Sequence, residues 1–247
     1  WGVLEMESYG RTDAANDAYT TVLSTATEAK YAISALAQGN TADADTVINR
    51  LKSTNNLSGN YYIYSIPYIL LAYDAAGTDT SAGCTITRDA LVAAMVSYLS
   101  NLSTNGADTD EVTPILAALA KYYNAASYSA AGITEANYNG VRSAVASAIN
   151  WLSNRQNSDG TWSYYGTSCS ESTALSIVAL SALGIDAHTD ARFIKNYNSA
   201  VEGLMTFALT NNSGFGHKGN VTYNAMATEQ GFRALVAYAN FKNGGKA

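Results

Sequence analysis

The stretch ALSIVALSALG (174–184) is apolar on almost every side when it is drawn as a helix. A helix of this kind offers no face to water, so it has to be buried on all sides. Three other stretches follow the same pattern, which predicts four buried helices of this type. The other three are PYILLAYDAAG (67–77), PILAALAKYY (114–123) and AMATEQGFRALVAYA (225–239).

Helices of a second kind are expected between the buried ones. Their apolar residues follow steps of three and four, so each helix has one apolar face. The clearest examples lie at 44–51, 91–102, 141–152 and 197–208. The two kinds alternate along the chain, which indicates a ring of buried helices enclosed by a ring of amphipathic ones.

This alternation predicts an all-α fold, an (α/α)6 toroid with an inner and an outer ring of helices. Inner helices are expected at residues 1–10, 26–37, 61–76, 110–123, 170–183 and 225–240. Outer helices are expected at residues 13–24, 42–53, 87–102, 137–154 and 190–209. This count leaves one outer helix missing before Trp1. We expect a single toroid domain over 1–241 and a linker-like tail over 242–247, cut from a longer multidomain chain.

Composition restricts the range of functions. Charged residues make up only 14% of the 247 residues, tyrosine occurs 18 times, and the net charge is −6. Nucleic acid is excluded as a partner because phosphate binding needs clustered Lys and Arg. No apolar run reaches the roughly 18 residues that insert into a membrane. An uncharged, tyrosine-rich surface indicates an extracellular protein, either secreted or attached to the cell surface. Cys84 and Cys169 form one disulfide or are two unrelated small residues.

Five residues take equivalent positions when the inner helices are aligned on ESTAL (171–175). They are Glu28, Tyr64, Glu111, Glu171 and Glu229. In a toroid these positions lie at one mouth, where carboxylates can coordinate a cation or accept hydrogen bonds from a polar ligand. Helix capping is the alternative interpretation, because the helix dipole favours a carboxylate in the first turn.

Capping motifs account for three of the four glutamates. The capping spacing occurs at Thr25-x-x-Glu28, Asp108-x-x-Glu111 and Ser168-x-x-Glu171. Glu229 has no such partner at Met226, so it is the glutamate that we most expect to bind a ligand. Tyrosines in the loops before the inner helices add to the candidate site, because their rings and hydroxyls suit flat polar ligands or sugars. They are Tyr62, Tyr64, Tyr165 and Tyr223. The alternative is ordinary surface tyrosine in a tyrosine-rich chain.

The stretch QNSDGTW (156–162) resembles the QW motif of the prenyltransferase and squalene-cyclase repeat. INWL (149–152) before it and SESTALSIVALSALG (170–184) after it extend the likeness. The chain resembles bacterial cell-surface proteins that carry this repeat, which implies an α/α toroid and a structural role for the motif. Gln156 is then expected at a helix end, Gly160 in the turn, and Trp162 against the Gln amide with its indole N–H donated. NNSGFG (211–216) is a degenerate second copy.

The stretch DTDE (108–111) is the sharpest catalytic candidate. Class II terpene cyclases of this superfamily place a D-x-D-D acid at the start of a buried helix, which implies Asp110 as the proton donor. Glu111 departs from that pattern by replacing the last Asp. A helix start with Asp108 as N-cap and Glu111 three residues later is the alternative. The superfamily's zinc ligands have no counterpart in this chain, so we expect no metal and no required cofactor.

We therefore expect a non-catalytic extracellular module, monomeric and joined to adjacent domains, that binds a small molecule, a glycan or a partner at the toroid mouth. Cobalamin is a ligand by analogy only, since the α/α domain of cobalamin carriers is similar. The alternative is an enzyme acting on terpenoids or glycans through carboxylates at the mouth. A spacer without a ligand is the third hypothesis.

Overall fold

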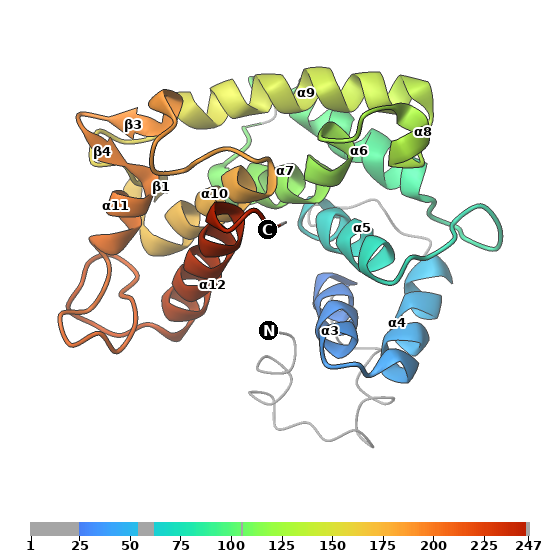
Figure 1. The fold of residues 1–247 in the computed structure, drawn as a ribbon, viewed down its shortest axis with the longest axis horizontal. Coiled ribbons are helices and arrows are strands. Elements are labelled where there is room, and N and C mark those ends of the chain that lie inside the picture. The colour runs from blue at the N-terminus through green and yellow to red at the C-terminus, as the bar shows by residue number, and fades with distance from the viewer. Residues whose placement is uncertain (1–24, 54–61, 105, 246–247) are drawn as a thin grey trace. The chain divides into compact units, whose positions relative to one another are not determined.

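The computed structural model describes residues 25–53, 62–104 and 106–245, and these are mostly helical (Figure 1). The helices are α3 (Thr25–Ala37), α4 (Thr41–Ser53), α5 (Ile66–Ala75), α6 (Arg88–Ser100), α7 (Thr109–Tyr123), α8 (Tyr128–Ala131), α9 (Glu135–Asn154), α10 (Ser170–Ala182), α11 (Ala200–Met205) and α12 (Ala225–Lys242). Two short 3-10 helices, η1 (Tyr62–Tyr64) and η2 (Ala191–Phe193), accompany them. The helices expected at 1–10 and 13–24 lie outside the described residues.

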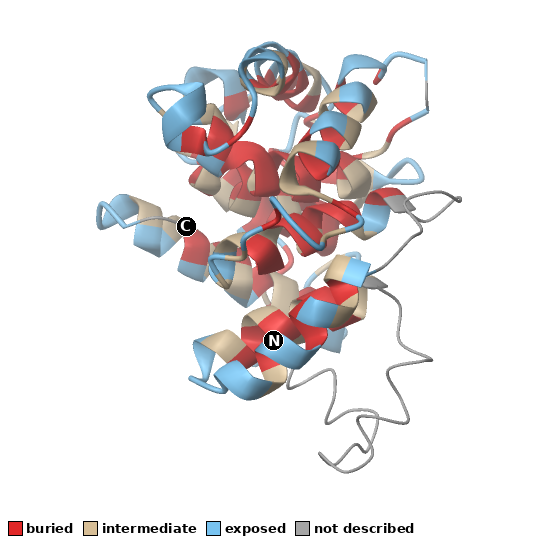
Figure 2. Cartoon of the chain, turned by 90° about the vertical axis from the view of Figure 1, so that its right-hand side faces the viewer, coloured by how far each residue is buried: buried red, intermediate tan, exposed pale blue. Residues whose placement is uncertain are grey.

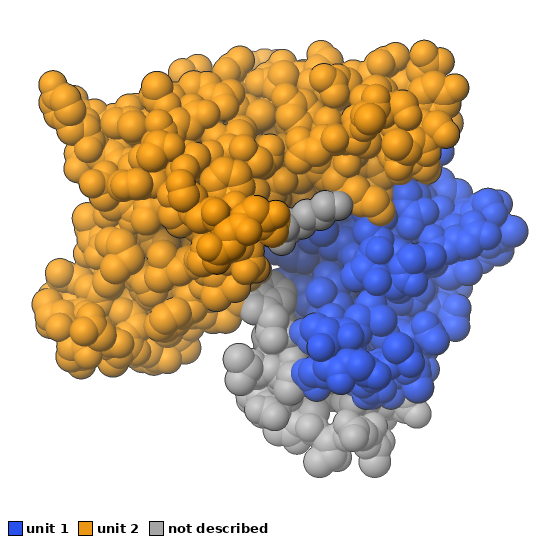
Figure 3. Space-filling view, viewed as in Figure 1, with its two compact units in different colours: residues 1–95 blue, residues 96–247 orange. Residues whose placement is uncertain are grey.

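The chain divides into two compact units, residues 1–95 and 96–247 (Figure 3). The boundary falls within α6. The expected single domain over 1–241 and the tail over 242–247 stay predictions.

In the first unit, α3 packs against α4 and α5. The apolar face predicted for α4 is confirmed, since Val47, Ile48 and Leu51 are buried. Pro67 lies in the first turn of α5, where its missing N–H removes no helical hydrogen bond. Arg88 ties the end of α5 to the loop that follows it. Its Nε donates to Asp74 at 3.0 Å.

The second unit is built around α10, which packs against α7, α11 and α12. Burial of ALSIVALSALG is confirmed for most of α10, because Ala174, Ile177, Ala179 and Leu180 are buried, while Leu175, Val178 and Ala182 are intermediate. Figure 2 colours the buried residues of the chain red. The polar residues of α10 are buried as well, and two of them use the helix backbone as their hydrogen-bond partner. Thr173 donates to the Cys169 carbonyl and Ser176 to the Ser172 carbonyl, both at 2.8 Å.

Helix α12 differs from the prediction of burial on every side. Its small residues face α10 and are buried, which allows the two helices to approach closely. The larger side chains of Met226, Phe232 and Val236 are each more than half exposed. Near its end, α12 is fixed by Asp186, which accepts from the Tyr238 hydroxyl at 2.9 Å and from Lys242 Nζ at 2.8 Å.

The amphipathic helix predicted over 190–209 is wrong for its first half. The structure has the 3-10 helix η2 there, followed by a hairpin of β3 (Ile194–Lys195) and β4 (Asn198–Ser199). Within this range, only α11 is α-helical. Asn196 and Tyr197 have φ angles of 46° and 68°, which a right-handed helix does not allow. The apolar spacing was misleading, because Tyr197 is 97% exposed.

A second hairpin precedes α10. Strands β1 (Trp162–Tyr164) and β2 (Thr167–Cys169) pair antiparallel, with Trp162 opposite Cys169. Tyr165 and Gly166 form the turn, both at positive φ. In the described ranges, no helix is long and apolar enough to cross a membrane.

Candidate functional site

The Q-x-x-x-G-x-W segment forms a clasp, which we define as Gln156, Gly160 and Trp162. Gln156 Nε2 donates to the carbonyls of Gly160 and Phe193, each at 3.0 Å. Trp162 is fully buried, and its indole N–H donates at 2.9 Å to Leu152 O in the last turn of α9. That carbonyl also accepts from the N–H of Arg155, the C-cap residue of α9, at 3.2 Å. These contacts fit the structural role predicted for the motif, which stays a prediction.

Gly160 is required at its position for two reasons. Its φ of +83° lies in the left-handed region, which disfavours every side chain. A Cβ there would also overlap the backbone of Ser199 at the end of β4. Gly203 in α11 makes the reciprocal approach, since its Cβ would lie 2.6 Å from the Gly160 carbonyl carbon. The clasp therefore holds β1, β4 and α11 together through backbone contact.

The degenerate copy at 211–216 repeats part of this geometry. The Phe215 backbone N–H donates to Thr228 Oγ1 at 2.9 Å, as the Trp162 N–H donates to Thr173 Oγ1 at 3.0 Å. Both threonines are the fourth residue of their helix, α12 and α10. Glu229 is the fifth residue of α12, whereas Glu171 is the second of α10. The alignment of Glu229 with Glu171 is therefore wrong by three residues.

The start of α7 carries the predicted cap. Asp108 Oδ1 accepts from the Glu111 N–H at 3.0 Å, and Glu111 Oε2 accepts from the Asp108 N–H at 3.0 Å. This is a complete capping box. Tyr98 donates a further hydrogen bond to Glu111 at 2.6 Å. Glu111 is therefore used by the helix cap, whereas the Asp110 side chain takes no part in it.

Asp110 lies between α7 and α10. Its Oδ1 accepts from the Ser172 hydroxyl at 2.5 Å, and Ser172 Oγ accepts in turn from the Cys169 thiol at 3.1 Å. Burial is the largest influence, and it raises the pKa of Asp110 to about 6. The Ser172 hydrogen bond opposes this rise, while the nearby carboxylates of Asp108 and Glu171 reinforce it.

Glu171 does not form the capping box with Ser168 that the sequence predicts. Ser168 bonds to Asn157 and Thr161, and the N-cap of α10 is Cys169, whose side chain makes no capping hydrogen bond. The predicted capping box is therefore wrong, because the β1–β2 hairpin takes Ser168 away from the helix start. Glu171 Oε2 lies 2.8 Å from His217 Nδ1 instead. This histidine was assigned no role from the sequence, since 46 residues separate the pair.

The acids at Glu28 and Glu229 have basic neighbours on their own units. Glu28 lies 3.4 Å from Arg50 Nε, and burial raises its pKa against the opposing effect of that arginine. Glu229 pairs with Arg233 one turn along α12, at 3.6 Å. The first pair joins α3 to α4, and the second lies within α12. Ligand binding by either glutamate stays a prediction.

The tyrosines differ in what they offer. Tyr165 is 90% exposed at the β1–β2 turn, and its ring centroid lies 4.4 Å from that of Tyr164. Tyr165, partial burial and the carboxylates of Asp108 and Asp110 all raise the pKa of Tyr164. This places the tyrosine pair beside the start of α7. Tyr64 is partly exposed in the first unit, and the side chain of Tyr62 lies outside the described part of the chain.

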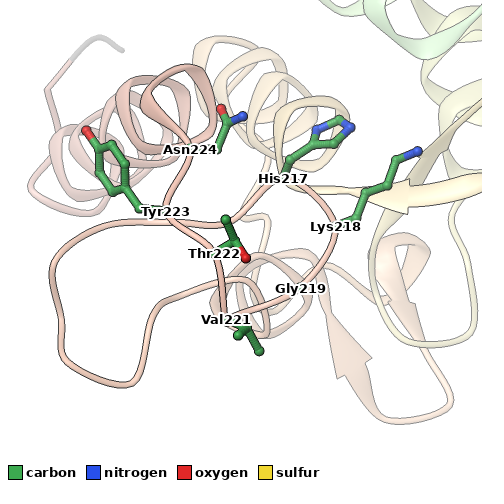
Figure 4. A pocket seen from close by; sticks show the side chains of 7 residues that line it. All are labelled: His217, Lys218, Gly219, Val221, Thr222, Tyr223 and Asn224. Carbon is green, nitrogen blue, oxygen red and sulfur yellow. The ribbon is translucent and has the colours of Figure 1, made fainter.

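A small pocket of about 280 Å³ lies in the loop before α12 (Figure 4). Its lining residues are His217, Lys218, Gly219, Val221, Thr222, Tyr223 and Asn224. The side chains of Lys218 and Tyr223 point away from one another in this view. The pocket shares His217 with the start of α10, because His217 pairs with Glu171.

Both cysteines are free thiols. Cys84 donates to the Ile86 carbonyl at 2.8 Å, and burial raises the pKa of Cys169, which disfavours the reactive thiolate. Across the ranges that the structure covers, no three His, Cys, Asp or Glu side chains converge on a metal site.

The candidate site is the face where α7 and α10 begin, and we call it the α7–α10 face. It consists of Asp110, Glu171, Ser172, His217 and the pair Tyr164–Tyr165. Comparisons with known protein families, with curated proteins and with solved structures found no match to this chain.

Proposed function

We propose that the protein is a non-catalytic binding module whose α7–α10 face takes a small polar ligand. Its helices would belong to an α/α toroid, as the alternation of buried and amphipathic segments and the QW-like clasp suggest. An extracellular position fits the low charge and the tyrosine-rich composition.

The observation that carries this proposal is the state of Asp110. Two helices bring Asp110 and Glu171 to one face, where burial and mutual repulsion raise the pKa of Asp110 to about 6. The cap of α7 is complete without Asp110, and the Ser172 hydrogen bond offsets part of the cost of burying the Asp110 carboxylate. A ligand that donates hydrogen bonds or carries positive charge would relieve it.

The ligand class follows from the rest of the face. Carboxylates at Asp110 and Glu171 accept hydrogen bonds, and Tyr164 and Tyr165 supply ring faces and hydroxyls. Polyhydroxylated and amide-bearing small molecules match this set, and cobalamin, whose corrin carries amide side chains, is one of them by analogy. Isoprenoid chains fit less well, since the face presents carboxylates, hydroxyls and an imidazole.

One observation favours an enzyme as the second candidate. A carboxyl group with a pKa of about 6 is still partly protonated near neutral pH, and the protonated fraction can act as a general acid. Asp110 would then protonate an alkene or a glycosidic oxygen, with Glu171 as the second carboxylate. The Ser172 hydrogen bond would orient the Asp110 carboxyl in either role.

A thermal-shift panel separates these possibilities. The protein is heated with corrinoids, Ca²⁺, soluble oligosaccharides or isoprenoid diphosphates, because a ligand of the native state raises the melting temperature by mass action. Binding at the α7–α10 face predicts a shift with one class that is lost in Asp110→Asn and in Glu171→Gln. Asp190→Asn is the matched control, because Asp190 pairs with Arg192 outside the α7–α10 face, and this variant should keep the shift.

Two results would count against the proposal. A shift that survives both substitutions would place the ligand elsewhere. No shift with any class would leave the acids at α7 and α10 without a ligand among those expected. Turnover of an oligosaccharide or isoprenoid diphosphate that Asp110→Asn abolishes would favour the enzyme.

A further inference from the structure

Both hairpins of the second unit end in a tyrosine that points into solvent. Tyr165 is 90% exposed at the β1–β2 turn, and Tyr197 is 97% exposed at the β3–β4 turn. The two turns are similar, because both central residues have positive φ in each case. Turns of this kind favour Asn and Gly at these positions.

The backbone makes tyrosine a poor choice at both places. Tyr165 has a φ of 47° and Tyr197 a φ of 68°, in the region that disfavours residues with a Cβ. Neither side chain returns stability through burial, since almost all of its surface is in water. The two tyrosines share no turn position, as Tyr165 comes first in its turn and Tyr197 second. What they share is an aromatic side chain that is almost fully exposed to water at the tip of a hairpin.

The clasp fixes the roots of both hairpins. The Gln156 amide bridges them, because it donates to Gly160 O two residues before β1 and to Phe193 O directly before β3. Trp162, the first residue of β1, is fully buried, and Gly160 packs on Ser199 at the end of β4. The tips therefore stand on one rigid base, as a preorganised contact surface requires.

The neighbouring residues indicate what the tips contact. WSYYGTSC (162–169) contains no charged residue, and IKNYNS (194–199) contains only Lys195. That lysine is occupied by the fold, since its Nζ donates to Ser153 Oγ and to Arg192 O. Neither tip therefore offers an available charged side chain to pair with a charged partner. A protein interface needs a contiguous apolar centre, whereas these rings are surrounded by hydroxyls and amides.

We infer that the two tyrosine-tipped hairpins bind a neutral polysaccharide. The flat C–H face of a sugar ring packs on an aromatic ring, and the Ser, Thr and Asn side chains beside it exchange hydrogen bonds with sugar hydroxyls. An extended chain offers repeated rings, so both tips can contribute to the binding of one molecule. Tyr165 also belongs to the α7–α10 face, whereas Tyr197 lies outside it, so loss of retention in Tyr197→Gly tests this inference separately from the carboxylates at Asp110 and Glu171.

Pull-down of the whole chain on insoluble cellulose, chitin and starch tests this inference. Wild type is expected to be retained on at least one of them. Tyr197→Gly and Tyr165→Asn should each weaken retention about three- to ten-fold, the range for losing one aromatic contact. The double variant should lose more than either alone. Tyr128→Ala, at a 45% exposed tyrosine on α8, is the control and keeps full retention.

The substitutions introduce the residues that these turns prefer, so melting temperatures should be unchanged or higher. That combination, weaker binding with an equal or more stable fold, is the signature of a contact residue. Failure of all three polysaccharides to retain wild type overturns the inference, and so does full retention of the double variant or a lower melting temperature in Tyr197→Gly. Retention on a polysaccharide with no small-molecule thermal shift would support these tips and refute the binding proposed for the α7–α10 face.

Discussion

Removing the indole of Trp162 is expected to be the most destabilising single change in the clasp. The side chain is fully buried and lies against Phe193, with ring centroids 6.2 Å apart. Truncation of a buried aromatic to alanine costs about 3–5 kcal/mol. The Leu152 carbonyl also loses the indole donor but keeps the Arg155 N–H, so the lost hydrogen bond adds about 1 kcal/mol at most. Trp162→Ala should therefore lower the free energy of unfolding by about 4 kcal/mol or more.

Two further variants divide this loss into its parts. Trp162→Phe keeps most of the ring and removes the N–H, so a loss of about 1–2 kcal/mol is expected. Trp151→Ala is the matched control on α9. Its ring is only half-buried and stacks with Arg155 at 4.2 Å, an interaction of about 0.5–1 kcal/mol.

Urea unfolding followed by far-ultraviolet circular dichroism measures all three, because it does not depend on tryptophan emission. Equal losses for Trp162→Ala and Trp151→Ala would refute the reasoning, as would a loss below about 1 kcal/mol for Trp162→Ala. Either result would mean that the motif does not hold the helices together.

Three other changes have defined outcomes. Gly203→Ala should cost about 2 kcal/mol in urea unfolding, because its Cβ meets the rigid backbone of Gly160, whereas Gly140→Ala meets only a valine side chain and should be nearly neutral. Partial burial alone would raise the pKa of Asp186, but its Lys242 and backbone donors hold it well below its usual range. Asp186→Asn should therefore destabilise at pH 7, and the difference should close as the pH falls below about 4. Asp110→Asn should do the opposite: it stabilises above pH 6 by about 1–3 kcal/mol, and the gain disappears below about pH 4.

Local patterns in the sequence predicted the local structure well. The apolar stripe of α4, the burial of α10 and the capping box at Asp108 and Glu111 depend on residues a few positions apart, and all three are confirmed. The hairpin at 194–199 was missed because its turn, Asn196–Tyr197, lacks the glycine that usually marks one. Its apolar spacing also matched a helix, although Tyr197 faces water.

The candidate site depends on contacts that no local pattern encodes. Asp110 meets Ser172 across 62 residues, and Glu171 meets His217 across 46. Sequence alone placed Asp110 and Glu171 at helix starts, yet it could not assign their partners, because those follow from how α7, α10 and the loop before α12 pack. Ser168 shows the reverse case, since the β1–β2 hairpin removes it from the cap that the spacing predicts.

The most direct test of the α7–α10 face is a ¹³C NMR titration of the Asp110 side-chain carboxyl, assigned by its absence in Asp110→Asn. A midpoint near pH 6 is expected, because the carboxyl is buried beside other carboxylates. Addition of a ligand identified by thermal shift should move that midpoint down if the ligand supplies hydrogen bonds or positive charge. A midpoint near 4, the value of an unperturbed aspartate, would contradict the proposal. It would mean that Asp110 is an ordinary surface acid and that the face has no electrostatic reason to take a ligand.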